Sequence, residues 1–246
     1  ERREFWLEFD IRNHFKLGPI KYHNVVATIK GSQYPDEYVI ISGHLDAFDV
    51  ATGGVDCGTG IAPMMEAARL IALSGAKPKR SIIFVGFAAE EFGLLGAKAF
   101  CKTHKDKLPK IANLFNRDGG PNAAVGISVP QAWYDDFVEI SKPIKEYNPE
   151  YPFDVTVAQP RPKPTQMGGT DATVFAVNGV PTFGLRESDF KGYNFNYGEI
   201  WHTERDLYTK SIPEYMEHTS VVTAIVALGV ANLKHQLSRE GMYTDQ

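Results

Sequence analysis

Apolar runs suited to β-strands alternate along the chain with segments whose apolar residues recur at helical spacing. Such alternation is typical of an α/β layer architecture and argues against a helical bundle or a β-sandwich. The strands that we expect cover residues 4–11, 25–30, 38–42, 82–88, 111–117, 124–129 and 181–185. The helices that we expect cover residues 59–73, 93–105, 130–146 and 170–177, with a last helix that residues 211–214 open and that runs to about 235.

Local signals refine this outline at three places. Residues 31–36 are rich in turn formers and predict a hairpin-like connection between the second and third expected strands. The four prolines within residues 152–167 predict an irregular surface loop, and residues 187–201, rich in Gly, Asn and Tyr, predict a long functional loop. Ser211 and Glu214 have the spacing of a capping box and predict the start of the last helix.

The composition excludes several classes of protein. With 43% hydrophobic residues the chain is not disordered, and no run of about 18 apolar residues predicts a membrane span. The net charge of −4 is spread along the chain, which gives no electrostatic reason to expect binding to nucleic acid or to an anionic membrane. Two cysteines are too few for a disulfide framework or a thiolate zinc site.

The chain starts at Glu1, and no signal or transit pattern follows. Because the expected first strand begins almost at once, we expect residues 1–246 to form a single domain that is part of a longer precursor. No break in the pattern indicates a second domain. We expect a secreted or periplasmic protein, although no targeting segment in the chain indicates this. The oligomeric state is not predicted.

Polar residues gather where three apolar strands are expected to end. His44 and Asp46 follow the first of these strands, Glu90 and Glu91 the second, and Asp118 the third. Ligands of open α/β sheets bind outside the carboxyl ends of the strands. Histidine and carboxylates at three such ends make a metal site the leading hypothesis.

The paired acids Glu90 and Glu91 have two interpretations of about equal weight when taken alone. They are either a solvated start of a loop or helix, where acids are favoured, or the two halves of a metal-dependent catalytic pair. In the second case one acid coordinates a dication while its neighbour stays free as a general base.

The remaining candidates also have ordinary structural alternatives. His44 suits a metal ligand whose other ring nitrogen is held by Asp46, whereas most single histidines are structural. Asp56 stands in a glycine-dense turn before a helix, where it would equally serve as an N-cap. His202 ends the long loop and would otherwise be a surface histidine. Asp206 either accepts a hydrogen bond that steadies this loop or is a surface acid without a role.

Together, and in this order, these elements resemble the co-catalytic zinc aminopeptidase family, which includes bacterial leucyl aminopeptidases, aminopeptidase Y and glutamate carboxypeptidases. The matching elements are Gly43-His44-Leu45-Asp46, Gly54-Val55-Asp56, the residues 88–96, the strand end at Asp118, and Trp201-His202-Thr203. The resemblance runs from about residue 24 to 233. Residues 35–40 are similar to the plasma glutamate carboxypeptidase branch, in which a protease-associated domain often lies upstream.

The resemblance implies a zinc exopeptidase with a central mixed, largely parallel β-sheet that is flanked by helices on both faces. It implies two zinc ions per chain, with Asp56 bridging them, and peptides as substrates. His44 and Asp118 would complete one metal site, and Glu91 and His202 the other. Glu90 would be the general base, and Asp46 would orient His44.

Further positions follow less directly from the resemblance. The family usually has Asp or Asn after the bridging aspartate, where this chain has Cys57; the peptide bond there is often cis, and the favoured interpretation of Cys57 is a small buried residue. Asp171 lies in an element near the active site and would hold substrate or a loop, or simply start a helix. Tyr193, Phe195 and Tyr197 of the long loop are the expected walls of a substrate pocket.

Two rival functions remain at the level of sequence. A glutaminyl cyclase-like acyltransferase shares the fold but typically works with one zinc ion, and a catalytically silent binding domain of this fold would have lost ligands. Because all five implied ligands are present, we expect a hydrolase, acting as an aminopeptidase or a dipeptidase.

Overall fold

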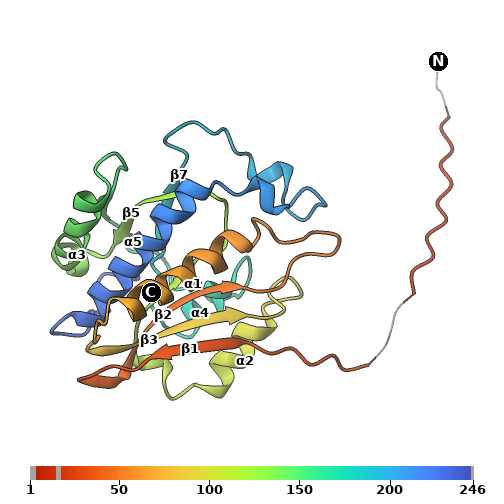
Figure 1. Cartoon of the computed structure of the whole chain (residues 1–246). Coiled ribbons are helices and arrows are strands. Elements are labelled where there is room, and N and C mark those ends of the chain that lie inside the picture. Colours follow the sequence, from red (N-terminus) through yellow and green to blue (C-terminus); the bar gives the residue numbers. More distant parts are fainter. Residues whose placement is uncertain (1–3, 15–17, 245–246) are drawn as a thin grey trace.

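A four-stranded mixed sheet lies at the centre of the protein (Figure 1), whose computed structural model describes residues 4–14 and 18–244. Its strands are β1 (Val25–Ile29), β2 (Tyr34–His44), β3 (Arg80–Phe87) and β4 (Ile111–Asn116), in the order β1-β3-β2-β4. Strands β2, β3 and β4 are parallel, and β1 is antiparallel to β3. A second sheet has the order β6-β5-β7, from β5 (Ala123–Val129), β6 (Asp154–Val157) and β7 (Leu185–Ser188).

Helices cover both faces of the central sheet. The helices α1 (Gly58–Leu73) and α5 (Pro213–Asn232) pack together on one side, with α3 (Tyr134–Tyr147) against α5. The helices α2 (Leu95–Thr103) and α4 (Asp171–Val177) pack together on the other side. Short 3₁₀ turns occupy Leu108–Lys110, Gln131–Trp133, Tyr197–Glu199 and Tyr208–Lys210. The α/β class and the helices on both faces are therefore confirmed.

Side chains that alternate along β2 and β3 supply both cores. Val39 and Ile41 of β2 belong to the cluster that α1 and α5 cover, whereas Ile40 between them belongs to the cluster that α2 and α4 cover. Successive side chains of a strand point to opposite faces, so a sheet covered on both sides needs continuous apolar runs. This requirement explains why residues 82–88 carry no polar alternation.

Two expectations for the first part of the chain are wrong. Residues 4–11 form no strand, and Phe5, Leu7 and Phe9 are all more than three-quarters exposed. Their alternation offers an apolar face, but none of the described residues pairs with it. The turn at 31–36 does not form a hairpin either, because β3 lies between β1 and β2 and pairs with both. The continuous apolar run of β3 gains more burial at this inner position than at an edge.

Three later boundaries also differ from the sequence prediction. The proline-rich stretch 152–167 contains the short strand β6. The expected strand 181–185 is displaced to β7, because residues 181–183 lie beside β4, where Leu114 N donates to the Pro181 carbonyl. The capping box does not form: α5 has Ile212 at its N-cap without a side-chain hydrogen bond, and Glu214 accepts from Lys191 instead.

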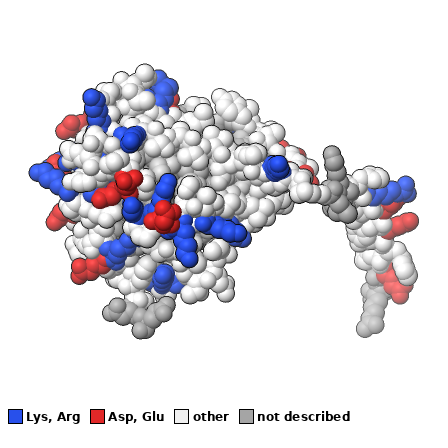
Figure 2. Space-filling model, turned by 90° about the horizontal axis from the view of Figure 1, so that it is seen from below, with Lys and Arg blue, Asp and Glu red and all other residues white. Residues whose placement is uncertain are grey.

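No helix among the described residues has the length and apolar character needed to cross a membrane. On the face shown in Figure 2, basic and acidic side chains are interspersed over the body of the protein. That face therefore presents no large area of a single charge.

Candidate metal centre

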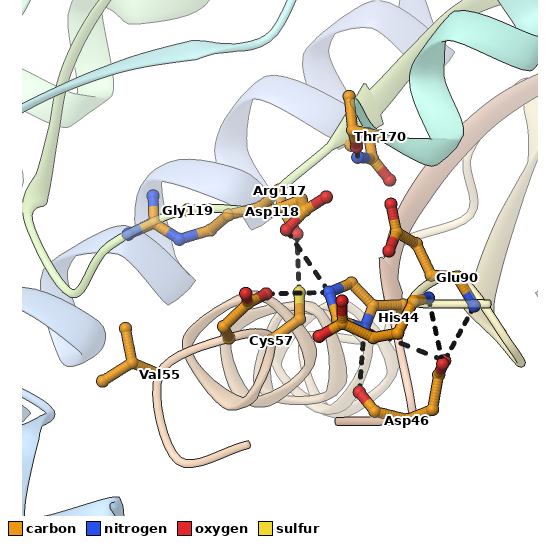
Figure 3. Close-up of polar contacts among 12 residues, drawn as sticks. His44, Asp46, Val55, Cys57, Glu90, Arg117, Asp118, Gly119 and Thr170 are labelled. Atoms are coloured by element: carbon orange, nitrogen blue, oxygen red, sulfur yellow. Dashed lines mark hydrogen bonds and ion pairs between the residues drawn. The ribbon is translucent and has the colours of Figure 1, made fainter. Parts of the chain in front are cut away.

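The polar residues that were expected to meet lie together at the carboxyl edge of the central sheet. His44 is the last residue of β2, Glu90 follows β3 in a short turn, and Asp118 follows β4. Because these three strands are parallel, their ends reach the same edge, and Figure 3 shows the side chains facing one another there. Asp56 joins them from the turn before α1.

His44 is held in one orientation by its neighbours. Its Nδ1 donates to the main-chain oxygen of Asp46 at 2.8 Å, which leaves Nε2 facing the site. Nε2 lies 2.9 Å from Asp56 Oδ1 and 3.3 Å from Asp118 Oδ1. A neutral imidazole fixed in this way presents a lone pair to the space shared with the two carboxylates, as a metal-binding histidine does.

Asp46 acts differently from the expectation that its carboxylate holds His44. The carboxylate oxygen lies 3.8 Å from His44 Nδ1, beyond hydrogen-bond distance, and the main-chain carbonyl takes that role. The carboxylate instead accepts hydrogen bonds from the amides of Glu90 at 3.0 Å and Glu91 at 3.1 Å. Asp46 therefore fixes both elements: its main-chain oxygen holds the His44 ring, and its carboxylate holds the backbone of Glu90 and Glu91.

The two acids of the pair have different partners. Glu91 Oε2 lies 2.9 Å from His202 Nε2, while its other oxygen, Oε1, is buried with no hydrogen-bond partner among the described residues. Glu90 is 8% exposed, makes no ion pair with a described histidine, and extends past His44 toward Thr170 (Figure 3). The geometry thus separates one acid that is paired with a ligand-type histidine from one that is not.

His202 reaches the site from the long loop between β7 and α5. Its ring is stacked on Phe48, with centroids 4.1 Å apart and an interplanar angle of 5°, and the Trp201 ring lies 4.1 Å from it at 30°. Its φ of 57° lies in the left-handed region, which a residue with a side chain adopts only where its surroundings hold it there. Aromatic packing against Phe48 and Trp201 therefore helps to hold the ring of this histidine in place.

The concentration of carboxylates perturbs their protonation. Burial, with help from the charge of Asp118, raises the pKa of Glu90 to about 8. Burial and the charge of Asp56 raise the pKa of Glu91 as well. Burial alone would lower the pKa of His44, but hydrogen bonds with Asp118 and Asp56 outweigh it and raise this pKa. Carboxylates so close together need bound protons or a cation.

The donor set fits a metal ion. One nitrogen or oxygen atom from each of His44, Asp56 and Glu91 lies within 4.8 Å of the others. The same separation holds among a His44 nitrogen, Cys57 Sγ and an Asp118 oxygen. Imidazole nitrogen and carboxylate oxygen are ordinary zinc ligands, and the unpartnered Oε1 of Glu91 is the kind of buried acceptor that a metal would satisfy.

Cys57 is buried and takes part in hydrogen bonding. Its Sγ donates to the main-chain oxygen of Arg117 at 3.1 Å, and burial raises the pKa of the thiol. Its burial and its hydrogen bond to a main-chain carbonyl favour the expected role of a small buried residue. The peptide bond between Asp56 and Cys57 is cis, as the resemblance implied.

A pocket of about 520 Å³ opens over the cluster. Besides the acids and His202, it is lined by Gly93, Leu94, Lys98, Met167, Gly168, Gly169, Tyr197 and Trp201. Tyr197 is thus placed as a pocket wall, but Tyr193 is not, because its ring packs on Tyr215 and its hydroxyl donates to Glu214. The long loop therefore supplies the pocket with only one of the two expected tyrosines.

Asp171 lies at the start of α4 but does not line the pocket. It is 1% exposed, and neither carboxylate oxygen has a hydrogen-bond partner among the described residues. Burial raises its pKa to about 7, because an ionised carboxyl without partners is costly there. In this arrangement it is placed to affect the charge near the site rather than to touch a ligand in the pocket.

Sequence reasoning missed one residue that lines the pocket. Lys98 of α2 lines the pocket, and helical spacing on an otherwise ordinary surface gave no sign of it. For Asp206 the sequence left open a hydrogen-bond acceptor or a surface acid without a role; the residue is 1% exposed and accepts hydrogen bonds from the backbone before α1.

Comparisons with known proteins find relatives over most of this chain. Residues 24–226 match peptidase family M28. Carboxypeptidase Q of Rattus norvegicus is 32% identical over 231 residues, which is 92% of this chain and 46% of that protein. The chain therefore spans about half the length of the curated relatives that it matches.

Solved structures show the same fold. The crystal structure of a peptidase M28 precursor from Shewanella amazonensis SB2B has a TM-score of 0.71 at 30% identity, covering 87% of this chain and 46% of that one. BSAP, a zinc aminopeptidase from Bacillus subtilis, has a TM-score of 0.61 at 21% identity, covering 82% of this chain and 49% of that one. Because the family model matches residues 24–226, which is most of its length, the chain belongs to peptidase family M28.

Proposed function

We propose that the chain carries the active site of a two-zinc exopeptidase that hydrolyses a peptide bond near a free terminus. The observation that supports this most is the convergence of nitrogen and oxygen donors on one point. Carboxylate oxygens of Asp56 and Asp118 lie within 3.3 Å of His44 Nε2. Glu91, which is paired with His202, adds a second group beside Asp56. Five donors with Asp56 shared between two groups suit a pair of metal ions.

The residues divide into metal ligands and a general base. His44 and Asp118 would hold one ion, Glu91 and His202 the other, and Asp56 both. When bound, zinc supplies Lewis acidity, which polarises a carbonyl and lowers the pKa of water. Glu90 would accept a proton from the attacking water and deliver it to the amine that leaves. Its place at the pocket, beside the ligands but paired with none of the described histidines, suits that task.

The pocket would hold the substrate's end. Tyr197 and Trp201 offer aromatic surface, and Gly168 and Gly169 leave room for a peptide backbone close to the acids. Peptides are therefore the proposed substrates, and Tyr197 is the proposed contact from the long loop. Asp171, which the sequence also indicated, would act from behind this surface, whereas Tyr193 lies outside the pocket.

The direct test is metal analysis joined to a substrate panel. Protein purified without chelator should contain about two zinc ions per chain, and chelation should abolish hydrolysis of dipeptides and amino-acyl amides until zinc is restored. Protein that retains no zinc and stays inactive on reloading would contradict the proposal. Release of ammonia from N-terminal glutamine without peptide hydrolysis would favour the glutaminyl cyclase-like alternative. Protein that binds zinc but turns over no substrate would favour a silent binding domain.

Lys98 gives a prediction about which substrates bind well. Among the described residues lining the pocket it is the one Lys or Arg, and its Nζ donates to the Gly93 carbonyl at 2.8 Å. A substrate carboxylate would be a stronger acceptor than that carbonyl. We expect Lys98→Gln to raise KM for a dipeptide about tenfold, while KM for the matching dipeptide amide changes little.

The control for this prediction is Lys102→Gln, which removes an exposed lysine from the same helix outside the pocket. Steady-state kinetics on both substrates with both variants gives the comparison. Equal changes for the dipeptide and its amide would show that Lys98 does not bind the carboxylate.

A further inference from the structure

Asp206 collects hydrogen bonds from the turn that carries Asp56. Its Oδ1 accepts from the Val55 amide at 2.6 Å, and its Oδ2 accepts from the Asp56 amide at 3.3 Å. Its main-chain oxygen accepts from Thr52 Oγ1 at 2.8 Å and from the Gly54 amide at 3.4 Å. Four donors within residues 52–56 therefore end on one residue that lies far away in the sequence.

The two segments touch backbone to backbone. A Cβ atom on Gly54 would lie 2.1 Å from both the Leu207 carbonyl carbon and the Tyr208 nitrogen, so no other residue fits there without a backbone shift. Asp206 is 1% exposed as a result, and water does not compete for its carboxylate. A buried carboxylate that accepts two backbone amides fixes the position of those amides closely.

The same residue is tied to His202. The Asp206 amide donates to the Thr203 carbonyl at 3.1 Å, and Thr203 Oγ1 donates to the Ile200 carbonyl at 2.8 Å, which makes a compact turn after the histidine. One end of this turn thus carries the His202 ring, and the other end carries the acceptor for the Asp56 backbone. Movement of either segment would move the other.

We propose that Asp206 is a positioning residue that sets the Asp56 carboxylate between the two metal positions and keeps His202 in register with it. This inference rests on the two-zinc site proposed above. Asp206 itself lies outside the donor groups around His44, and its carboxylate is occupied by amides. Its contribution passes through the backbone of Asp56.

The variant Asp206→Asn tests this role with little change of shape. The amide keeps one acceptor oxygen but turns an N–H toward one of the two backbone amides, so one hydrogen bond is replaced by repulsion between donors. Loss of a group that orients a metal ligand typically weakens metal binding by about 10–100-fold. We expect that loss in zinc affinity, measured by competition with a chromophoric chelator.

The matched control is Glu204→Gln, which removes an exposed acid from the same turn and should leave zinc affinity unchanged. Amide hydrogen exchange on the metal-free proteins adds a readout independent of zinc. The amides of Val55 and Asp56 should exchange faster in Asp206→Asn than in the control, while those of the α5 core should not. If Asp206→Asn fails to fold, Thr52→Val, which removes only the hydroxyl donor at an exposed position, should show a smaller change in the same direction.

The outcomes separate this inference from the proposed function. A wild-type protein that binds no zinc contradicts the two-zinc site itself. A wild-type protein that binds zinc, together with an Asp206→Asn variant that binds it as tightly and melts at a lower temperature, shows that Asp206 only stabilises the fold. Unchanged zinc affinity in a folded Thr52→Val variant would likewise contradict the positioning role when Asp206→Asn cannot be purified.

Discussion

Replacing Glu90 by glutamine is expected to lower kcat for peptide hydrolysis by about 10²–10⁴ while leaving the zinc content unchanged. Glutamine preserves the shape of the side chain and the main-chain hydrogen bond to Asp46, but it neither accepts nor delivers a proton. Glu90 borders the pocket and makes no ion pair with His44 or His202, so the metal ligands should remain in place. Steady-state kinetics and elemental analysis of the same preparation measure both quantities.

The control is the adjacent substitution Glu91→Gln, which has the same chemistry at nearly the same place. Glu91 lies 2.9 Å from His202 and has a buried oxygen without a partner, so its loss should weaken zinc binding, with activity recovering at high zinc. Should Glu90→Gln lose zinc while Glu91→Gln keeps it, the roles within the pair are exchanged, although the site itself stands.

The strand ends that build the site were predictable because two strong signals coincide there. Continuous apolar runs in β2 and β3 can be stable only between two layers of helices, and the polar residues that follow them must then lie at one edge. His44, Glu91 and Asp118 owe their places to this rule. Their assignment to particular roles came from a resemblance to a family, because spacing alone left ordinary alternatives for each.

Strand pairing was predicted less well, because the local pattern of a strand does not determine which other strand it pairs with. Residues 4–11 alternate as a strand does, yet no described residue pairs with them. The turn at 31–36 has the composition of a hairpin, but β3, which comes 36 residues after β2 (80 − 44 = 36), takes the position between β1 and β2. Long-range burial decided this order, and the sequence of the turn carries no trace of it.

Asp46 and Asp206 show a second limit. The sequence presents Asp46 as a side chain near His44, whereas the contact with the histidine is made by its main-chain oxygen. Asp206 stands in a polar segment, and its burial depends on Gly54, whose missing side chain lets two distant backbones meet. Neither a hydrogen bond to a main-chain oxygen nor a contact between two backbones can be predicted from the amino-acid types along the chain.

Zinc-free protein is expected to lose stability as the pH rises from about 6 to 8.5, whereas zinc-loaded protein is expected to gain stability over the same range. Without metal, the pKa of Glu90 lies at about 8 and that of Asp171 at about 7, both raised mainly by burial. A carboxyl whose pKa is higher in the folded state binds its proton more tightly there. Its contribution to stability is complete below the pKa of the unfolded chain and is lost as the pH rises through the folded value.

The expected size follows from the same shifts. Deprotonating these two groups across that range should cost the folded state about 3 kcal/mol, which lowers the melting temperature of a chain of this size by about 5–10 °C. Zinc reverses the slope, because it binds deprotonated ligands and stabilises the folded protein more as protons leave. Calorimetry with chelator and with excess zinc measures both profiles.

Matched variants assign the effect to these two carboxyls. Glu90→Gln and Asp171→Asn each remove one titrating group from the cluster, so each should flatten the profile of the metal-free protein, and Asp171→Asn should act mainly below pH 8. The exposed acid Glu204, changed to Gln, should leave the profile as it is. A metal-free protein whose melting temperature rises or stays level over this range would show that the acids are not held protonated by the fold, and that the repulsion among them is relieved in some other way.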